Sequence, residues 1–261
     1  MWVRSGAAVA LVAGVLAGPA AAQDIVNPTW ASIPDSEAMA EVYPEFASMA
    51  TLDGDVNLRC TVAPDGTLSL CRVNVAVPEG VGFDEAALAL APRFRVNPRE
   101  IDGEATKSSV QFTIRFRMEP IEALPTWKGV EPSPEHVASA GRVLAAMIGP
   151  EMTAMTEELA ALDLNVSPER ESRVRAMVLQ VEAEFSDDEK QAAVLAMARL
   201  ITPEQLADIE AGRAWPPRPL DEQLASAGDV ANQITDKKYA RLRQLYCAEF
   251  ECPERKSVPV I

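Results

Sequence analysis

The pattern of hydrophobic and polar residues changes once along the chain, between Pro120 and Pro134. Before this stretch apolar and polar residues tend to alternate, which is typical of β-strands with one buried face. After it, apolar residues recur every three or four positions, as on one face of an α-helix. We therefore expect an α+β domain at residues 23–120, a proline-rich linker at 121–132 and an α-helical domain at 133–261.

Two alternating segments flank the turn Pro64-Asp65-Gly66 and predict an antiparallel hairpin. A two-residue turn would set Cys60 directly opposite Cys71. A three-residue loop with Gly66 as the left-handed bulge residue would instead place Val62 opposite Leu68. The apolar residues lie at even-numbered positions up to Leu68 and at odd-numbered positions from Cys71 onward. We therefore expect the three-residue loop together with one further bulge, which restores the pairing of Cys60 with Cys71.

Facing residues of an antiparallel pair are close enough for a disulfide, so we expect a Cys60–Cys71 bond. Two reduced core cysteines or half of a metal site are the alternatives, but the only histidine, His136, lies beyond the linker. Cys247 and Cys252 are expected to form a second disulfide that ties the C-terminal tail to the last helix. Their spacing is not the C-x-x-C of catalytic redox pairs.

After the hairpin, Phe83 to Leu88 predicts a helix with Asp84 as its cap, and a short extended piece follows at Phe94 to Val96. The clearest strand comes next, because apolar residues alternate strictly with polar ones. Its core side is Val110, Phe112, Ile114, Phe116 and Met118, and its polar side is Gln111, Thr113, Arg115 and Arg117. Together these elements predict a small antiparallel three-stranded sheet with one face covered by a helix.

Near the start of the chain, Arg4 precedes a short uncharged apolar run that ends in Ala20-Ala21-Ala22, a pattern typical of a secretory signal. We expect cleavage after residue 22 rather than retention as an anchor, because glycines and Pro19 interrupt a run already short for a membrane span. No cysteine follows that could carry a lipid. The expected product is a periplasmic protein without a stable membrane anchor, in a compartment that permits disulfides.

The net charge is −15, and both halves carry more acidic than basic side chains. Nucleic acids and anionic membranes are therefore not expected partners, because binding them depends on basic groups.

A series of short motifs, in order, resembles the C-terminal domain of TonB family proteins over about residues 28–118. The series is Tyr43-Pro44, Gly54-Asp55-Val56, Cys60-Thr61-Val62, Pro64-Asp65-Gly66, Pro78, Gly82-Phe83-Asp84, Ala86-Ala87-Leu88, Phe94 to Pro98, Asp102-Gly103 and Phe112 to Phe116. None of these motifs is specific to the family alone, but their occurrence in this order is specific. The resemblance implies a periplasmic module that binds an extended receptor segment by adding it as a strand to the edge of its sheet.

The resemblance also implies where a partner would bind. The matching edge is Val110, Gln111, Phe112, Thr113, Ile114, Arg115, Phe116 and Arg117. The two arginines either contact the partner or only keep an edge strand soluble. Tyr43 and Pro44 match the entry motif of the family, and we expect them to pack the protein's own chain against the sheet where it enters the domain.

TonB itself resembles a tethered rod, with an uncleaved anchor helix and a long proline-rich spacer before this domain. We expect neither here, so force-coupled transport does not carry over, whereas binding a periplasmic or outer-membrane protein segment does. The alternative is a helix-led envelope scaffold in which the TonB-like domain is only a docking platform. The sequence does not predict the oligomeric state.

Helix starts are well marked in the second half, at Ser133-Pro134-Glu135, Ser167-Pro168-Glu169 and Thr202-Pro203-Glu204, with a capping box expected at Ser186 to Glu189. The spacing of the first three invites a helical-repeat interpretation. The aromatic and glycine positions that define such repeats are missing, so we expect a compact bundle of five to seven helices.

No nucleophile motif or phosphate-binding glycine loop is present, so we expect no enzyme activity and no cofactor. A pair of carboxylates meeting in a cleft remains the open alternative. Copper binding by methionine thioethers is a further alternative, but these residues follow apolar faces, where methionine is an ordinary core residue, and no metal site is expected. They are Met147, Met152, Met155, Met177 and Met197.

Overall fold

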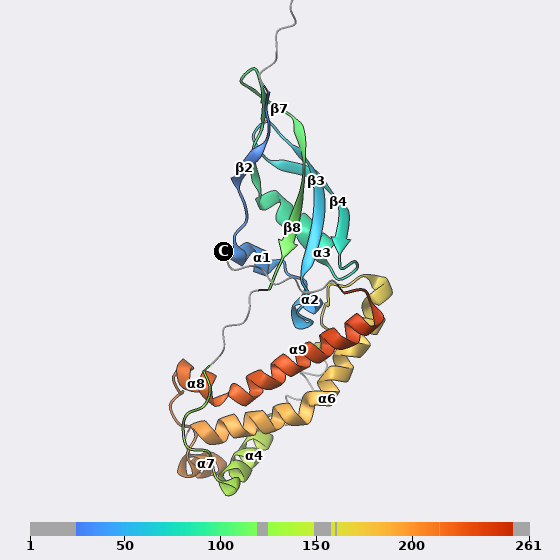
Figure 1. The fold of residues 1–261 in the computed structure, drawn as a ribbon. Coiled ribbons are helices and arrows are strands. Elements are labelled where there is room, and N and C mark those ends of the chain that lie inside the picture. The colour runs from blue at the N-terminus through green and yellow to red at the C-terminus, as the bar shows by residue number, and fades with distance from the viewer. Residues whose placement is uncertain (1–24, 119–124, 149–157, 160, 214, 253–261) are drawn as a thin grey trace, which may run out of the picture.

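The computed structural model describes residues 25–118, 125–148, 158–159, 161–213 and 215–252. They form a sheet unit, residues 25–118, and a helical unit, residues 125–252, which lie at opposite ends of an elongated molecule (Figure 1). The expected signal at residues 1–22 lies outside the described residues. Within the described residues, no helix is both long and apolar enough to cross a membrane.

The sheet unit is mixed α and β, as expected. Its helices are α1 (Ser36–Glu41), α2 (Glu45–Met49), α3 (Phe83–Leu90) and the 3-10 turn η1 (Ala91–Arg93). Its strands are β1 (Ile25–Val26), β2 (Thr29–Ser32), β3 (Gly54–Val62), β4 (Leu68–Val77), β5 (Arg95–Asn97), β6 (Arg99–Ile101), β7 (Glu104–Thr106) and β8 (Ser108–Phe116).

The central sheet has the strand order β4-β3-β8, and both ladders are antiparallel. On β3 every second residue is buried, and α3 contributes Phe83, Ala87 and Leu90 to the same core. The opposite face carries polar residues such as Asn57 and Thr113, together with the exposed Val75 and Val77 of β4. The predicted three-stranded sheet with one covered face is therefore confirmed.

The expected hairpin register is also confirmed. Val62 pairs with Leu68, and Gly66 adopts the left-handed conformation with φ 81°. The register then shifts, with Leu70 at φ 49°, and Arg59 pairs with Arg72. This shift brings Cys60 opposite Cys71. A second bulge, between Asn57 and Leu58, was not expected.

Short strands that the sequence did not predict lie at one end of the unit. β1, β6 and β7 form one small sheet, and β2 pairs with β5. The register of the β2–β5 pair shifts after Trp30, whose ring packs against Phe94 and Phe112 at centroid distances of 5.3 and 4.9 Å. The N-terminal strand thereby closes the core beside β8.

Five helices are described in the helical unit: α4 (Pro134–Ile148), α6 (Pro168–Leu200), α7 (Pro203–Glu210), α8 (Asp221–Ala227) and α9 (Asp229–Glu249). Three of them begin at the prolines expected to start helices. Thr202 makes a full capping box with Gln205. Within the described part of the linker, the backbone N–H of Trp127 donates to Asp229, and its ring lies against the Arg199 guanidinium.

The expected capping box at Ser186 to Glu189 is wrong, because α6 continues through it as one helix of 33 residues. Neither glycine nor proline occurs between Glu169 and Leu200, so nothing in the backbone opposes continuation. Lys238 of α9 reinforces the continuous helix by contacting Glu182 and Glu189, on either side of the expected break, at 2.7 and 2.6 Å.

One hydrophobic core joins the two units. It contains Phe46 of α2, Leu164, Val174 of α6 and Tyr246 of α9, each at most 2% exposed. The backbone N–H of Phe46 donates to the carbonyl of Leu164 at 3.2 Å. A second cluster, around Ala140, Val143, Ala198 and Leu206, packs α4 and α7 against the far end of α6.

The helix α3 begins differently from the expectation. Its N-cap is Gly82 rather than Asp84, in the left-handed conformation with φ 80°. A Cβ at this position would lie 2.3 Å from the carbonyl oxygen of Asn165. Glycine is required here because the helical unit approaches the α3 start so closely.

Candidate functional site

Strand β8 lies at the margin of the central sheet (Figure 1). It pairs with β3 without interruption from Gly54↔Phe116 to Val62↔Ser108. Among the described residues, β3 is the only strand that pairs with it. The other side of its backbone is therefore not used in any ladder within this part of the chain.

The disulfide identifies which backbone groups point away from the sheet. The Cα atoms of Cys60 and Cys71 are 4.0 Å apart, a separation typical of a non-hydrogen-bonded pair rather than the wider bonded kind. The backbone of Cys60 therefore points toward β8, where it faces Val110. By alternation, Ser109, Gln111, Thr113 and Arg115 direct their N–H and C=O groups outward.

Side chains of the predicted edge divide between the two faces. Ile114 and Phe116 are buried and Val110 and Phe112 are partly buried, all on the core side. Gln111 and Thr113 are exposed and bond to Asn57: Gln111 Nε2 donates to its Oδ1 at 2.9 Å, and Asn57 Nδ2 donates to Thr113 Oγ1 at 3.1 Å. These amide contacts hold the polar face in a fixed arrangement.

The two arginines of the edge have different surroundings. Arg117 forms an ion pair with Asp55 and donates to the carbonyl oxygens of Gly54 and Phe116 at 2.9 and 2.8 Å. This geometry fastens the end of β8 to β3. Arg115 is exposed, and no ion pair to it is found among the described residues. Of the two, Arg115 is the one available to a partner.

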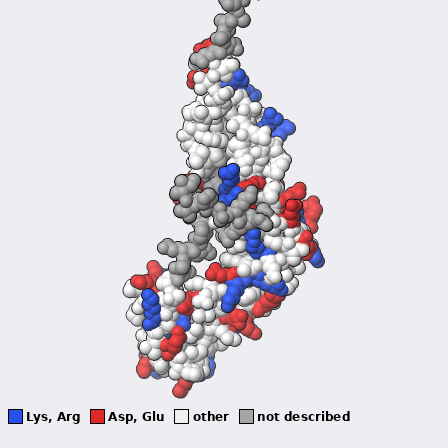
Figure 2. All heavy atoms as spheres, viewed as in Figure 1, with Lys and Arg blue, Asp and Glu red and all other residues white. Residues whose placement is uncertain are grey.

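A second arginine pair lies on the open face of the sheet. Arg59 on β3 stands directly opposite Arg72 on β4, and both side chains are exposed. Facing like charges destabilise a strand pair. In Figure 2 the middle of the sheet unit is largely uncharged, with groups of both signs toward its margins, whereas the helical unit carries many charges of both signs.

A cavity of about 580 Å³ opens between α1 and the end of β8. Its lining is Ser36, Glu37, Met39, Ala40, Tyr43, Ser48, Arg115, Arg117 and Met118. Apolar side chains thus lie next to the outward-facing backbone of the edge strand. The sequence predicted Arg115 and Arg117 in the site but missed α1, since a six-residue helix leaves too short a pattern to recognise.

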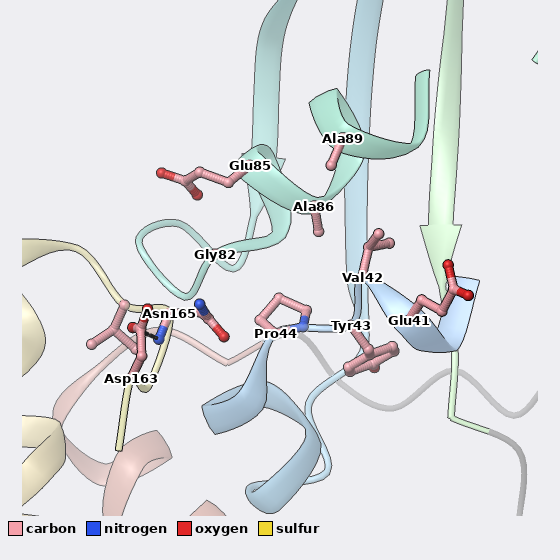
Figure 3. Close-up of a pocket in the computed structure, with 11 residues that line it drawn as sticks. Glu41, Val42, Tyr43, Pro44, Gly82, Glu85, Ala86, Ala89, Asp163 and Asn165 are labelled. Atoms are coloured by element: carbon pink, nitrogen blue, oxygen red, sulfur yellow. Dashed lines mark hydrogen bonds between the residues drawn. The ribbon is translucent and has the colours of Figure 1, made fainter. Parts of the chain in front are cut away.

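A different cavity, of about 450 Å³, lies where the end of α1, residues 42–44 and α3 meet residues 163–166 (Figure 3). Its acids are Glu41, Glu85 and Asp163. Glu41 pairs with Arg93 at 2.6 Å, and the pKa of Glu85 is raised by its hydrogen bond with Asp84 and then by burial. Among the described residues, no group of three or more histidine, cysteine or acidic side chains could hold a metal ion.

The family motif residues have structural surroundings. The hydroxyl of Tyr43 donates to the carbonyl of Leu52 at 2.6 Å, and its ring lies edge-on to Phe83 and Phe116. Pro44 is buried at the start of α2. A Cβ on Gly66 would lie 2.1 Å from the carbonyl oxygen of Val96, so the hairpin tip can meet β5 only with glycine there.

The cysteines, the histidine and the methionines singled out in the sequence have structural surroundings in the fold. Both expected disulfides, Cys60–Cys71 and Cys247–Cys252, are present. His136 Nε2 lies 2.8 Å from the carbonyl of Ile201, so the imidazole links α4 to the end of α6. Met177 is buried in the shared core, whereas Met152 and Met155 lie outside the described residues.

The comparison with protein families decides what this sheet unit is. Residues 39–118 match the family model of the Gram-negative bacterial TonB protein C-terminal. The expected resemblance is thus confirmed, with the match ending at the last described residue after β8. Among curated proteins none matches the chain.

The sheet unit is thus similar to the C-terminal domain of TonB, and this similarity associates it with the envelope and its transport systems. The family consists of periplasmic domains, and two disulfides fit an oxidising compartment. The match spans β3, β4, α3 and β8, the elements that build the edge. It does not extend to the helical unit.

Proposed function

We propose that this protein is exported to the periplasm by a cleaved signal and binds an extended segment of an envelope or outer-membrane receptor protein. Binding occurs by strand addition to the outer side of β8. The observation that carries the proposal is the row of outward backbone groups at Ser109, Gln111, Thr113 and Arg115, which no ladder uses in the described part of the chain. Such a row is the template for β-augmentation.

The surroundings of the row support this role. The strand is nine residues long and rests on a buried core, so its backbone is held in place before a partner arrives. Preorganisation lowers the conformational cost of binding. The exposed guanidinium of Arg115 adds a positive charge at the edge of an acidic protein, which favours segments that carry an acidic side chain.

The test uses the full chain from residue 23, with both disulfides formed, and a phage-displayed library of random dodecapeptides. Enriched peptides are synthesised and their affinities measured by biolayer interferometry. Hydrogen exchange should then show new protection at the amides of Gln111, Thr113 and Arg115. Peptides that protect other amides instead would contradict strand addition at β8.

Proline substitution supplies the decisive variant. Thr113→Pro removes one outward donor and leaves the bonds to β3 intact, so the domain should fold and the peptides should no longer bind. Ala76→Pro is the matched control, because Ala76 faces Val56 in a non-bonded pair and points outward from the opposite margin. Unchanged binding by Thr113→Pro would refute the proposal.

A second candidate is a helix-led scaffold, in which the helical unit contacts the partner and the TonB C-terminal domain serves as a platform. The core shared by α2, α6 and α9 favours this alternative, because it holds the two units together. In a pull-down from an outer-membrane extract, partners retained by Thr113→Pro but lost after charge reversal on the exposed side of α9 would support it.

A further inference from the structure

The cavity between α1 and β8 is continuous with the proposed binding edge. Arg115 and Arg117 belong to its lining, and by the alternation of β8 the backbone groups of Arg115 point outward. A strand added to β8 would run past the mouth of this cavity. The cavity therefore lies where side chains of the added strand arrive, on the side of α1.

Apolar groups dominate the inner surface of the cavity. Met39 and Tyr43 pack against the shared core, and Ala40 and Met118 lie beside them. Glu37 and Arg115 bring opposite charges to the lining, and the charge of its other ionised residue, Arg117, is balanced by the ion pair with Asp55. A volume of about 580 Å³ is more than enough for one aromatic or long aliphatic side chain.

A second apolar surface, the ring of Trp30, lies toward the other end of the same edge. Trp30 packs edge-on against Phe112, yet 42% of its surface remains exposed. Phe112 faces the core side of β8. Tyr43 of the cavity lining lies on this side as well, because its ring contacts Phe116. A residue paired opposite Phe112 would therefore place its side chain against the indole.

We propose that the added segment carries two large apolar side chains four positions apart, and this inference rests on the strand addition proposed above. One packs on Trp30 opposite Phe112. The other enters the cavity opposite Phe116, which stands between Arg115 and Arg117. Four strand residues span about 13 Å, and side chains at even spacing share a face, so both can point toward the core side at once.

The spacing determines the kind of partner. Alternating segments with small or charged residues at these two positions would pair with β8 but leave the cavity empty, so they would bind weakly. Filling the cavity with one aromatic side chain should raise affinity about 10- to 100-fold over alanine at that position.

The experiment uses the same full chain and the same dodecapeptide library, now compared with Ala40→Trp. Ala40 is exposed on α1 and borders the cavity, so an indole there fills it without entering the core. Wild-type enrichment should show large apolar residues at two positions four apart. Ala40→Trp should lose the preference at one of them and keep the other.

Synthetic peptides make the result quantitative. Alanine at the cavity position should weaken binding about 10- to 100-fold in the wild type and less than about twofold in Ala40→Trp. Leu88→Trp, on the exposed side of α3, is the control for adding an indole elsewhere. Circular dichroism and disulfide content confirm that each variant folds.

The outcomes separate the two proposals. Binding that Thr113→Pro abolishes, but without an apolar preference or without an effect of Ala40→Trp, overturns the cavity assignment and leaves strand addition standing. Peptide binding that is insensitive to Thr113→Pro, or no binding at all, removes both.

Discussion

The aromatic ring of Phe46 in α2 lies 5.2 Å from the ring of Tyr246 in α9, and both side chains are fully buried. This contact joins the family-matched domain to the helices that follow it. The Tyr246 hydroxyl also accepts a hydrogen bond from Arg170 at 2.6 Å. Burial raises the pKa of Tyr246, so the hydroxyl stays protonated at neutral pH.

Removing this ring should destabilise both units together. We expect Tyr246→Ala to lower the free energy of unfolding by about 3–5 kcal/mol, because it leaves a cavity in the shared core. Tyr246→Phe should cost only about 1–2 kcal/mol, through the lost hydrogen bond. Urea unfolding followed by far-UV circular dichroism gives both values, and an unchanged midpoint for Tyr246→Ala would show that the units do not share a core.

The two disulfides should contribute unequally to stability. Cys60–Cys71 closes a separation of 11 residues and Cys247–Cys252 one of five. Chain-entropy arguments give about 3 and about 2 kcal/mol, respectively. Urea unfolding of the Cys60→Ala/Cys71→Ala and Cys247→Ala/Cys252→Ala variants measures each contribution. A larger loss of unfolding free energy in the Cys247→Ala/Cys252→Ala variant than in the Cys60→Ala/Cys71→Ala variant would contradict this prediction.

Charge reversal on the open face of the sheet should be stabilising. Arg72→Glu converts the facing pair of Arg59 and Arg72 into an attractive one, with an expected gain of about 0.5 kcal/mol. The gain should shrink as salt rises from low to physiological concentration, because both groups are exposed. Arg72→Gln is the control that removes repulsion without adding attraction, and its stability should fall between the two.

Lys238 should make stability depend on pH in the alkaline range. Burial lowers the pKa of Lys238, but Glu182 and Glu189 outweigh burial and raise it above its ordinary value of 10.5. A raised pKa stabilises the fold fully below the unfolded value, and this stability is lost as pH rises through the folded value. Unfolding midpoints between pH 9 and 12 should therefore fall more steeply for wild type than for Lys238→Met.

The same substitution has an effect at neutral pH. Lys238→Met leaves two glutamates of α6 facing an apolar group, and should cost about 1–2 kcal/mol. Adding Glu182→Gln and Glu189→Gln should recover most of this loss. A single variant as stable as the wild type would show that the contact contributes nothing.

Local sequence patterns predicted the sheet unit well where turn residues and strict alternation mark the start and end of each strand. The turn at Gly66 predicted the hairpin register, and the change from even to odd apolar positions before Cys71 predicted the disulfide. The strict alternation of β8 predicted the edge strand. These signals are sufficient because the side-chain period of a strand is two, so a single slip moves the whole apolar set to the wrong face.

Contacts between distant segments left no such signal. Trp30 belongs to a four-residue strand after Pro28, and nothing nearby indicates that it packs on Phe112. The expected break at Ser186 shows the opposite failure, since a good capping sequence does not end a helix whose neighbours favour continuation. The cavity beside α1 also depends on the tertiary fold, because its lining comes from two short helices and the end of β8.

Continuity of the core through α2, α6 and α9 limits how freely this domain can be recombined. Transplanted into another polypeptide without its helices, the sheet unit would present Phe46 and its apolar neighbours to water. A variant that keeps strand β8 in this fold must also keep, or replace, the surface on which Phe46 rests. Separating the sheet unit from its helices would therefore remove part of its own core.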